Sequence, residues 1–172
     1  MIDDKNTIKR EFIINTLKKM ILKETGKDKF FSGIKINSKE IKKGNIFIAL
    51  KGEKENGHSY INEAIKNGAT GIISEKELTE DQLSIFYVKD SILALQEIAK
   101  KWKEQYNNIV TIGITGSVGK TTTKQFAEKI LNSEYNTIAP IKNFNNEIGV
   151  PLTMLKINKK TDILILEMGM YQ

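Results

Sequence analysis

The chain has 172 residues, 40% of them hydrophobic, which suffices for one ordinary domain or two small ones with a packed core. It has no cysteine and a single histidine, which excludes disulfides, thiolate metal sites and cysteine nucleophiles and leaves little scope for a histidine-based metal site. The formal charge is +6, but the lysines are spread along the chain without interleaved aromatic residues, so we expect no nucleic-acid partner.

The first 108 residues are predicted to alternate helices with strands. The opening residues are polar and lack the apolar core of a secretory signal, and no run of about 18 apolar residues follows, so we expect a cytoplasmic protein without a membrane span. Apolar residues at helical spacing predict a first helix over residues 7–24, ended by Gly26. Strands are predicted at 31–37 (one or a pair), 45–50, 70–74 and 84–88, and helices at 60–67 and from 90 to about 106.

The residues after 108 predict a second unit of alternating strands and helices. We expect strands at 109–115, 136–139 and 162–167, and helices at 120–131 and 148–155. These elements are too few to close a full α/β sheet, so the sequence is expected to be cut short at Gln172. We place a domain boundary at about residue 108.

A glycine-containing loop joins the strand at 109–115 to the helix at 120–131. Its small residues let backbone N–H groups turn inward around phosphate oxygens, and the positive end of the following helix faces the same anion. Lys120 is then expected to reach the outer phosphates of ATP, and the Thr121 hydroxyl to hold Mg2+. Ile114 stands where the general G-x-x-x-x-G-K-[ST] pattern has its first glycine, and a strand–helix turn without a ligand is the alternative. The predicted nucleotide contacts are Thr115, Gly116, Ser117, Val118, Gly119, Lys120, Thr121 and Thr122.

Two further segments carry polar groups towards the same predicted crevice. Glu167 ends the last apolar strand, and the carboxyl ends of parallel strands face the ligand crevice, so Glu167 is a candidate second magnesium contact beside Thr121. The alternative is a carboxylate that ends a strand in solvent. Three asparagines, Asn143, Asn145 and Asn146, precede the helix at 148–155, where amides serve as caps and turns or contact a polar ligand.

Together these segments resemble the Mur ligase family. The run at 115–124, TGSVGKTTTK, is similar to the ATP loop of that family. Its combination with NFNNEIGVPLTML at 143–155 and EMG at 167–169 resembles the branch that adds D-alanyl-D-alanine. Residues 37–52 are similar to the family segment that helps to seat the UDP part of the substrate, and the resemblance runs from about residue 30 to 172. The family shows Asp-Ser-Arg where this chain has Asn37-Ser38-Lys39, and lysine cannot copy the two-pronged grip of arginine.

The resemblance implies an α/β fold: a small N-terminal UDP-substrate-binding domain over residues 1–108, then the truncated start of a P-loop, mainly parallel-sheet ATP-binding domain over 109–172. It implies an ATP-dependent amide ligase of peptidoglycan precursor synthesis, with Mg2+. ATP would phosphorylate the carboxylate of UDP-N-acetylmuramoyl tripeptide, and the amine of D-alanyl-D-alanine would attack the acyl phosphate. The site roles it implies are Lys120 and Asn146 as catalytic residues, Asn145 in the ATP crevice, Thr121 and Glu167 at magnesium, and Ser38 and His58 on the UDP-sugar side.

Three alternatives stay open at this point. The first is another Mur-type ligase, or a related amide ligase acting on folate or a polymer. The second is a non-catalytic ATP-binding module, and the third is a basic nucleic-acid-binding protein that only the charge of +6 supports. We expect a monomer, and we expect the 172 residues alone to be inactive in ligation.

Overall fold

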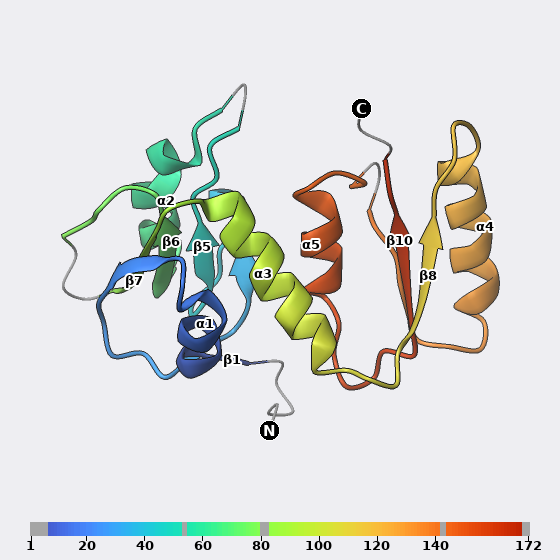
Figure 1. Cartoon of the computed structure of the whole chain (residues 1–172), viewed down its shortest axis with the longest axis horizontal. Coiled ribbons are helices and arrows are strands. Elements are labelled where there is room, and N and C mark those ends of the chain that lie inside the picture. Colours follow the sequence, from blue (N-terminus) through green and yellow to red (C-terminus); the bar gives the residue numbers. More distant parts are fainter. Residues whose placement is uncertain (1–6, 53–54, 80–82, 142–143, 170–172) are drawn as a thin grey trace. The chain divides into compact units, whose positions relative to one another are not determined.

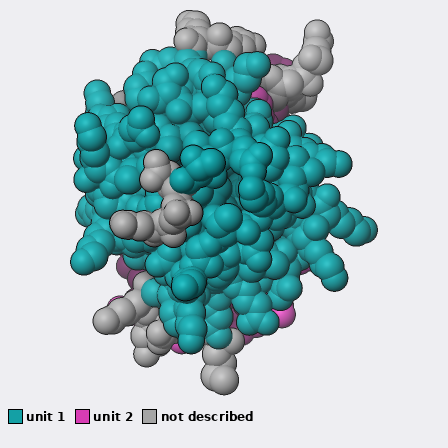
Figure 2. All heavy atoms as spheres, turned by 90° about the vertical axis from the view of Figure 1, so that its left-hand side faces the viewer, with its two compact units in different colours: residues 1–98 teal, residues 99–172 magenta. Residues whose placement is uncertain are grey.

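The computed structural model describes residues 7–52, 55–79, 83–141 and 144–169, and the chain forms two compact units. Unit 1 comprises Met1–Ile98 and unit 2 comprises Ala99–Gln172; Figure 2 colours them separately. The division falls inside helix α3 (Ser91–Glu104), which begins in unit 1 and ends in unit 2. The domain boundary near residue 108 stays a prediction. Among the described residues, no helix has the length and apolar content that a bilayer crossing requires.

Unit 1 is built on a five-stranded sheet in the order β2-β7-β6-β5-β4. The strands β4 (Ile34–Lys35), β5 (Ile46–Ile48), β6 (Gly71–Ser74) and β7 (Ser84–Val88) run parallel, and β2 (Ile21–Glu24) pairs antiparallel with β7 at one edge. Every residue of β5 and β6 is buried, as their uninterrupted apolar runs predict for strands covered on both faces. The remaining elements are the paired strands β1 (Ile8–Lys9) and β3 (Phe30–Phe31), the helices α1 (Arg10–Leu17) and α2 (Ile61–Lys66), and the 3-10 turns η1 (Ser38–Glu40) and η2 (Gly57–Tyr60).

The long first helix predicted over residues 7–24 is wrong. Helix α1 covers only Arg10–Leu17, and the chain re-enters the sheet as β2 at Ile21. Ile21 is paired with Val88 of β7, so backbone pairing at a sheet edge outweighs the helical spacing of the apolar residues. The other predicted helices and strands are confirmed, each with bounds within a few residues of the expectation.

Unit 2 is a three-stranded parallel sheet in the order β8-β10-β9. Its strands are β8 (Val110–Ile114), β9 (Thr137–Ile138) and β10 (Ile163–Glu167), and helices α4 (Lys120–Leu131) and α5 (Gly149–Met154) lie on opposite faces (Figure 1). Ile163 and Ile165 pack with Ala127 and Leu131 of α4. Because side chains alternate along a strand, Glu167 lies on this same face, towards α4.

Candidate nucleotide and magnesium site

The loop between β8 and α4 has the backbone conformation that its glycines allow. Gly116 has φ 145° and Gly119 has φ 82°, the left-handed region that side chains with a Cβ rarely adopt. A Cβ on Gly119 would meet no atom within 4 Å, so conformation and not crowding requires glycine there. Gly119 leads directly into Lys120, the first residue of α4, and the Lys120 Nζ donates to the Gly116 carbonyl at 2.5 Å. A hydrogen bond from the first residue of α4 to the Gly116 carbonyl therefore links the two ends of the loop.

Glu167 is hydrogen-bonded to two other predicted site residues, Thr121 and Asn145. Its Oε1 accepts hydrogen bonds from Thr121 Oγ1 and from Asn145 Nδ2, each at 3.2 Å. Thr121 belongs to the first turn of α4, and Asn145 precedes α5. Side chains from both segments therefore meet at the carboxyl end of the central strand β10. The side chain of Glu167 is 1% exposed. The alternative of a carboxylate that merely ends a strand in solvent is excluded.

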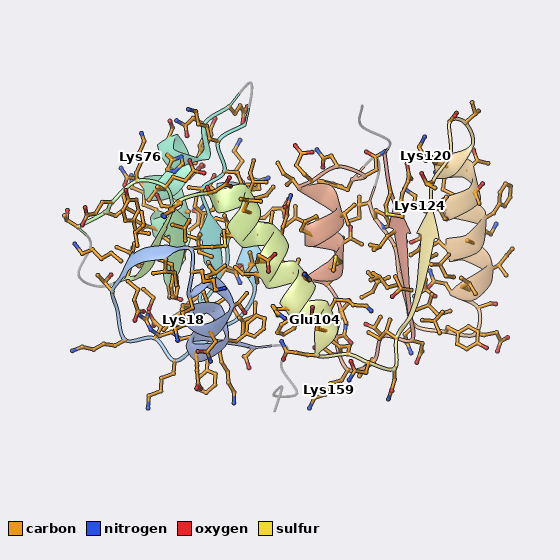
Figure 3. The ribbon with its side chains drawn as sticks, viewed as in Figure 1. Lys18, Lys76, Glu104, Lys120, Lys124 and Lys159 are labelled. Carbon is orange, nitrogen blue, oxygen red and sulfur yellow. The ribbon has the colours of Figure 1, made fainter. Side chains whose placement is uncertain are left out.

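Lys124 is a member of this site that the sequence analysis did not assign. Its Nζ lies 3.1 Å from Glu167 Oε2, and its side chain is 3% exposed. Figure 3 labels Lys124 together with Lys120. Lys124 lies three and seven residues before Ala127 and Leu131, on the stripe of α4 that faces the core. Because lysine is almost never fully buried unless it is paired, a lysine in that stripe was the signal for a buried acidic partner.

The environment of Glu167 keeps its carboxyl ionised. Burial opposes the charge, but hydrogen bonds from Lys124, Asn145 and Thr121, with the positive charge of Lys124, outweigh burial and hold the pKa of Glu167 below its ordinary 4.5. A carboxylate, a hydroxyl and an amide are oxygen-bearing groups of the kind Mg2+ accepts. The described residues contain no cluster of three or more histidine, cysteine, aspartate or glutamate side chains that could hold a metal. At a site with one carboxylate, phosphates and water would have to complete the coordination of Mg2+.

A hollow of about 570 Å³ opens beside the site. It lies between the inner face of α4 and the segment after β9, and its lining includes Thr121 and Lys124 together with Glu128 and Pro140. Two side chains of the Glu167 cluster therefore border an accessible space.

Asn146 serves the backbone around helix α5. Its Oδ1 accepts from the N–H groups of Gly149 at 2.8 Å and Ile148 at 3.3 Å, which satisfies donors at the helix start. A Cβ on Gly149 would lie 2.5 Å from the Cα of Phe144, so the loop also requires glycine at that position. A catalytic role for Asn146 stays a prediction. Asn143 lies outside the described residues.

The two residues predicted to face the UDP-sugar, Ser38 and His58, are both engaged inside unit 1. Ser38 is buried, and its hydroxyl donates to Glu63 at 2.5 Å. His58 Nε2 accepts the backbone N–H of Glu75 at 3.2 Å, so Nδ1 carries the ring proton and donates to Asn56 Oδ1 at 2.8 Å. Burial is the main cause that lowers the pKa of His58, against the charge of Glu75, which raises it. Their roles at the substrate stay predictions.

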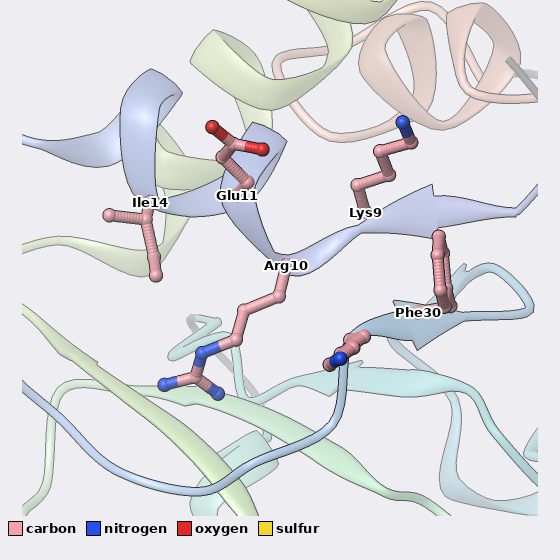
Figure 4. Close-up of a pocket in the computed structure, with 6 residues that line it drawn as sticks. Lys9, Arg10, Glu11, Ile14 and Phe30 are labelled. Carbon is pink, nitrogen blue, oxygen red and sulfur yellow. The ribbon is translucent and has the colours of Figure 1, made fainter. Parts of the chain in front are cut away.

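Unit 1 also has a cavity of about 370 Å³ beside β1 and α1, shown in Figure 4. Lys9, Arg10 and Lys29 are among its lining residues, which would suit an anion. However, Arg10 points away from Lys9 (Figure 4): its guanidinium is paired with Glu24 and lies 5.1 Å from the ring centroid of Phe86. Lys9 and Arg10 therefore do not converge on the cavity, and the loop in unit 2 is the stronger candidate site.

Two known protein-domain families match this chain, one after the other along the sequence. Residues 31–108 match the family described as Mur ligase family, catalytic domain, and residues 114–172 match the Mur ligase middle domain. Among curated relatives, the UDP-N-acetylmuramoyl-tripeptide–D-alanyl-D-alanine ligases of Synechocystis sp. and Bacillus subtilis are 38% and 36% identical over 78% and 80% of this chain. The chain spans 30% of the length of each of these relatives.

Solved structures give the same result. MurF from Acinetobacter baumannii is similar with a TM-score of 0.87 and 26% identity, over 98% of this chain and 37% of that one. MurF ligase from Thermotoga maritima, in complex with ADP, has a TM-score of 0.69 and 37% identity over 80% of this chain and 32% of that one. With the phosphate loop and its Glu167 cluster in place, these matches show that the chain belongs to the Mur ligase family.

Proposed function

We propose that this chain takes part in the ATP-dependent ligation of D-alanyl-D-alanine to UDP-N-acetylmuramoyl tripeptide, in the cytoplasm. The observation that carries the proposal is the convergence of Thr121 and Asn145 on Glu167 at the mouth of the glycine loop. Relatives that carry this activity in their names are 36–38% identical to the chain. The product is a precursor of peptidoglycan, so the reaction would serve cell-wall synthesis and through it cell shape and division.

The chemistry requires charge neutralisation on a transferring phosphoryl group. The tripeptide carboxylate takes the γ-phosphoryl group of ATP and releases ADP; the amine of D-alanyl-D-alanine then forms the amide, loses a proton and releases phosphate. Lys120 exchanges its bond to the Gly116 carbonyl for one to the phosphates, and the loop N–H groups hold the same oxygens. Magnesium, held by Thr121 and Glu167, would supply further positive charge at those oxygens.

The two domains divide the substrates in this proposal. Residues 1–108 seat the UDP-sugar, with Ser38 and His58 on that side, and residues 109–172 contribute the ATP loop. Asn145 orients Glu167 through its amide, and Asn146 holds the loop that carries Asn145. We propose that the chain acts as a monomer.

Calorimetric titration of the 172-residue chain tests this proposal with two ligands in separate experiments. Mg-ATP is expected to bind, and Lys120→Ala should weaken that binding by about tenfold or more, because a charged hydrogen bond to phosphate is lost. Lys129→Ala, an exposed lysine in the last turn of the same helix, is the matched control and should bind as the parent chain does. UDP-N-acetylmuramoyl tripeptide is expected to bind, and neither substitution should change its affinity.

Each negative result points to a different part of the proposal. ATP binding that survives in Lys120→Ala would contradict the phosphate loop. ATP binding without any affinity for the UDP-tripeptide would favour a non-catalytic ATP-binding module and would place the fault at Asn37-Ser38-Lys39, where the family pattern is not met.

A further inference from the structure

The carboxylate of Glu167 lies against a buried lysine. The Lys124 Nζ is 3.1 Å from Glu167 Oε2, whereas Lys120 is bound to the Gly116 carbonyl of the loop. Glu128 lines the same hollow as Thr121 and Lys124. Oε2 of Glu167 faces Lys124, and Oε1 accepts from Thr121 and Asn145. A divalent cation that arrives alone would therefore meet a carboxylate whose negative charge Lys124 already balances.

The countercharge on Glu167 is built into the fold. The Lys124 side chain is 3% exposed and lies on the core-facing stripe of α4, where it is paired with Glu167. The neighbouring hydrophobic groups Ala127 and Leu131 hold that face of the helix against β10. Lys120 differs, because it is only half-buried and is bound to a loop carbonyl that phosphate oxygens can replace.

We propose that Lys124 makes metal binding at Glu167 depend on a bound nucleotide. The positive charge of Lys124 balances the negative charge of Glu167, so Mg2+ gains little from the site before a nucleotide binds. The phosphates of a nucleotide add several negative charges, neutralise Lys120 and attract the metal. This rests on the proposed function only in requiring that the loop binds nucleotide phosphates. Lys124 is thus a positioning residue that acts through Glu167.

The experiment uses the 172-residue chain and Mn2+ as a paramagnetic substitute for Mg2+, with free Mn2+ measured by electron paramagnetic resonance. The parent chain should bind Mn2+ weakly alone and at least about tenfold more tightly with saturating ADP, because the phosphates add negative charge that Lys124 does not balance. Lys124→Gln keeps a hydrogen-bond donor but removes the charge, and should strengthen ADP-free Mn2+ binding by about tenfold or more. Lys124→Arg keeps the charge and should behave as the parent. Lys129→Gln removes one charge from the exposed end of the helix and should change nothing.

A variant that is only partly folded still gives an answer. At the same Mn2+ concentration without ADP, the thermal unfolding midpoint should rise more in Lys124→Gln than in the parent chain. The inference is overturned if Lys124→Gln binds ADP but takes up ADP-free Mn2+ as weakly as the parent, since Lys124 is then structural. It is also overturned if the parent binds Mn2+ equally well with and without ADP. Failure of every variant to bind ADP would instead overturn the phosphate site itself.

Discussion

At the scale of single residues, the pair of Lys124 and Glu167 is hard to explain as a source of stability. Removing two ions from water costs free energy that their attraction repays only in part, and apolar residues of similar size often serve stability as well or better. Position 124 lies in a stripe with Ala127 and Leu131, where an apolar residue would pack without that cost. The placement is therefore better explained by what Glu167 does than by the folding of unit 2.

Glu167→Gln separates these two aspects of the pair. The substitution leaves a buried Lys124 without its counterion, and it should lower the free energy of unfolding by roughly 3 kcal/mol. It should also abolish the effect of Mg2+ on ADP affinity, since the ionised oxygen is lost. Urea unfolding and ADP titrations with and without Mg2+ measure both effects. Glu134→Gln, on an exposed residue after α4, is the control. An unchanged magnesium effect in Glu167→Gln would remove this residue from the metal site.

The sequence predicted the residues of this site unevenly. Thr121 and Glu167 follow from strand and helix order, because parallel strands and the following helices bring their ligand-facing ends to one edge. The partners of Ser38 and His58 could not be derived, since Glu63 and Glu75 lie in segments whose approach depends on tertiary packing. Lys124 could be predicted to face the core from its spacing to Ala127 and Leu131 on α4. Its partner follows only when Glu167 is also placed on the face of β10 that packs against α4.

At the scale of elements, α1 and β2 show where sequence periodicity fails. The apolar residues between Ile8 and Ile21 keep helical spacing, yet the helix ends at Leu17. A strand of four residues has too short a pattern to be distinguished from the end of a helix, and its pairing with β7 involves residues more than sixty positions away. The strands β5, β6 and β7 were predictable because continuous apolar runs bounded by glycine or polar turns permit few alternatives.

The start of α5 gives a test of what Asn146 does. If its role is to satisfy the Gly149 N–H, Asn146→Ala should cost about 1 kcal/mol of unfolding free energy, and Asn146→Asp, which keeps the acceptor oxygen, should cost little. ADP affinity should be nearly unchanged in Asn146→Asp. Chemical denaturation and ADP titration of the two variants decide the matter: equal loss of stability in both would show that the amide nitrogen, and not the capping oxygen, is what the loop needs.

The turn η2 gives a prediction for pH. His58 has a folded-state pKa below its ordinary 6.5, so as pH falls through 6.5 the unfolded chain takes up a proton that the folded chain does not. The free energy of unfolding should therefore decline from about pH 6.5 down to the lowered pKa and then stop responding to this group. Carboxyl groups with lowered pKa, such as Glu75, lose their contribution only near and below their ordinary 4.5, which leaves the histidine window separate.

His58→Gln is the variant that isolates this effect. Urea unfolding of the parent between pH 7.5 and 5.5 should show the decline, and His58→Gln should show a flatter profile because its side chain does not titrate. A parent profile that is flat over the same range would contradict a folded-state pKa of His58 below its ordinary value.

At the scale of the whole molecule, the division into two units makes ligand effects separable. The single tryptophan, Trp102, lies in unit 2, is 3% exposed, and donates its indole N–H to the Ile157 carbonyl at 3.0 Å. Unit 1 has no tryptophan, so tryptophan fluorescence follows the unfolding of unit 2, whereas far-UV circular dichroism follows the helices and strands of both units.

Mg-ADP should therefore raise the unfolding midpoint measured by Trp102 fluorescence, which reports unit 2. It should have less effect on the part of the circular dichroism transition that comes from unit 1. At a ligand concentration of 100 times Kd the expected gain is about 2.7 kcal/mol, confined to the unit that binds. UDP-N-acetylmuramoyl tripeptide should do the reverse and act on the transition that the fluorescence does not report. Parallel melts with each ligand, and with Lys120→Ala as the control for ADP, measure both shifts. Equal shifts of the two signals with either ligand would show that the units unfold as one cooperative body, and a fluorescence shift with the UDP-tripeptide alone would move the substrate site into residues 99–172.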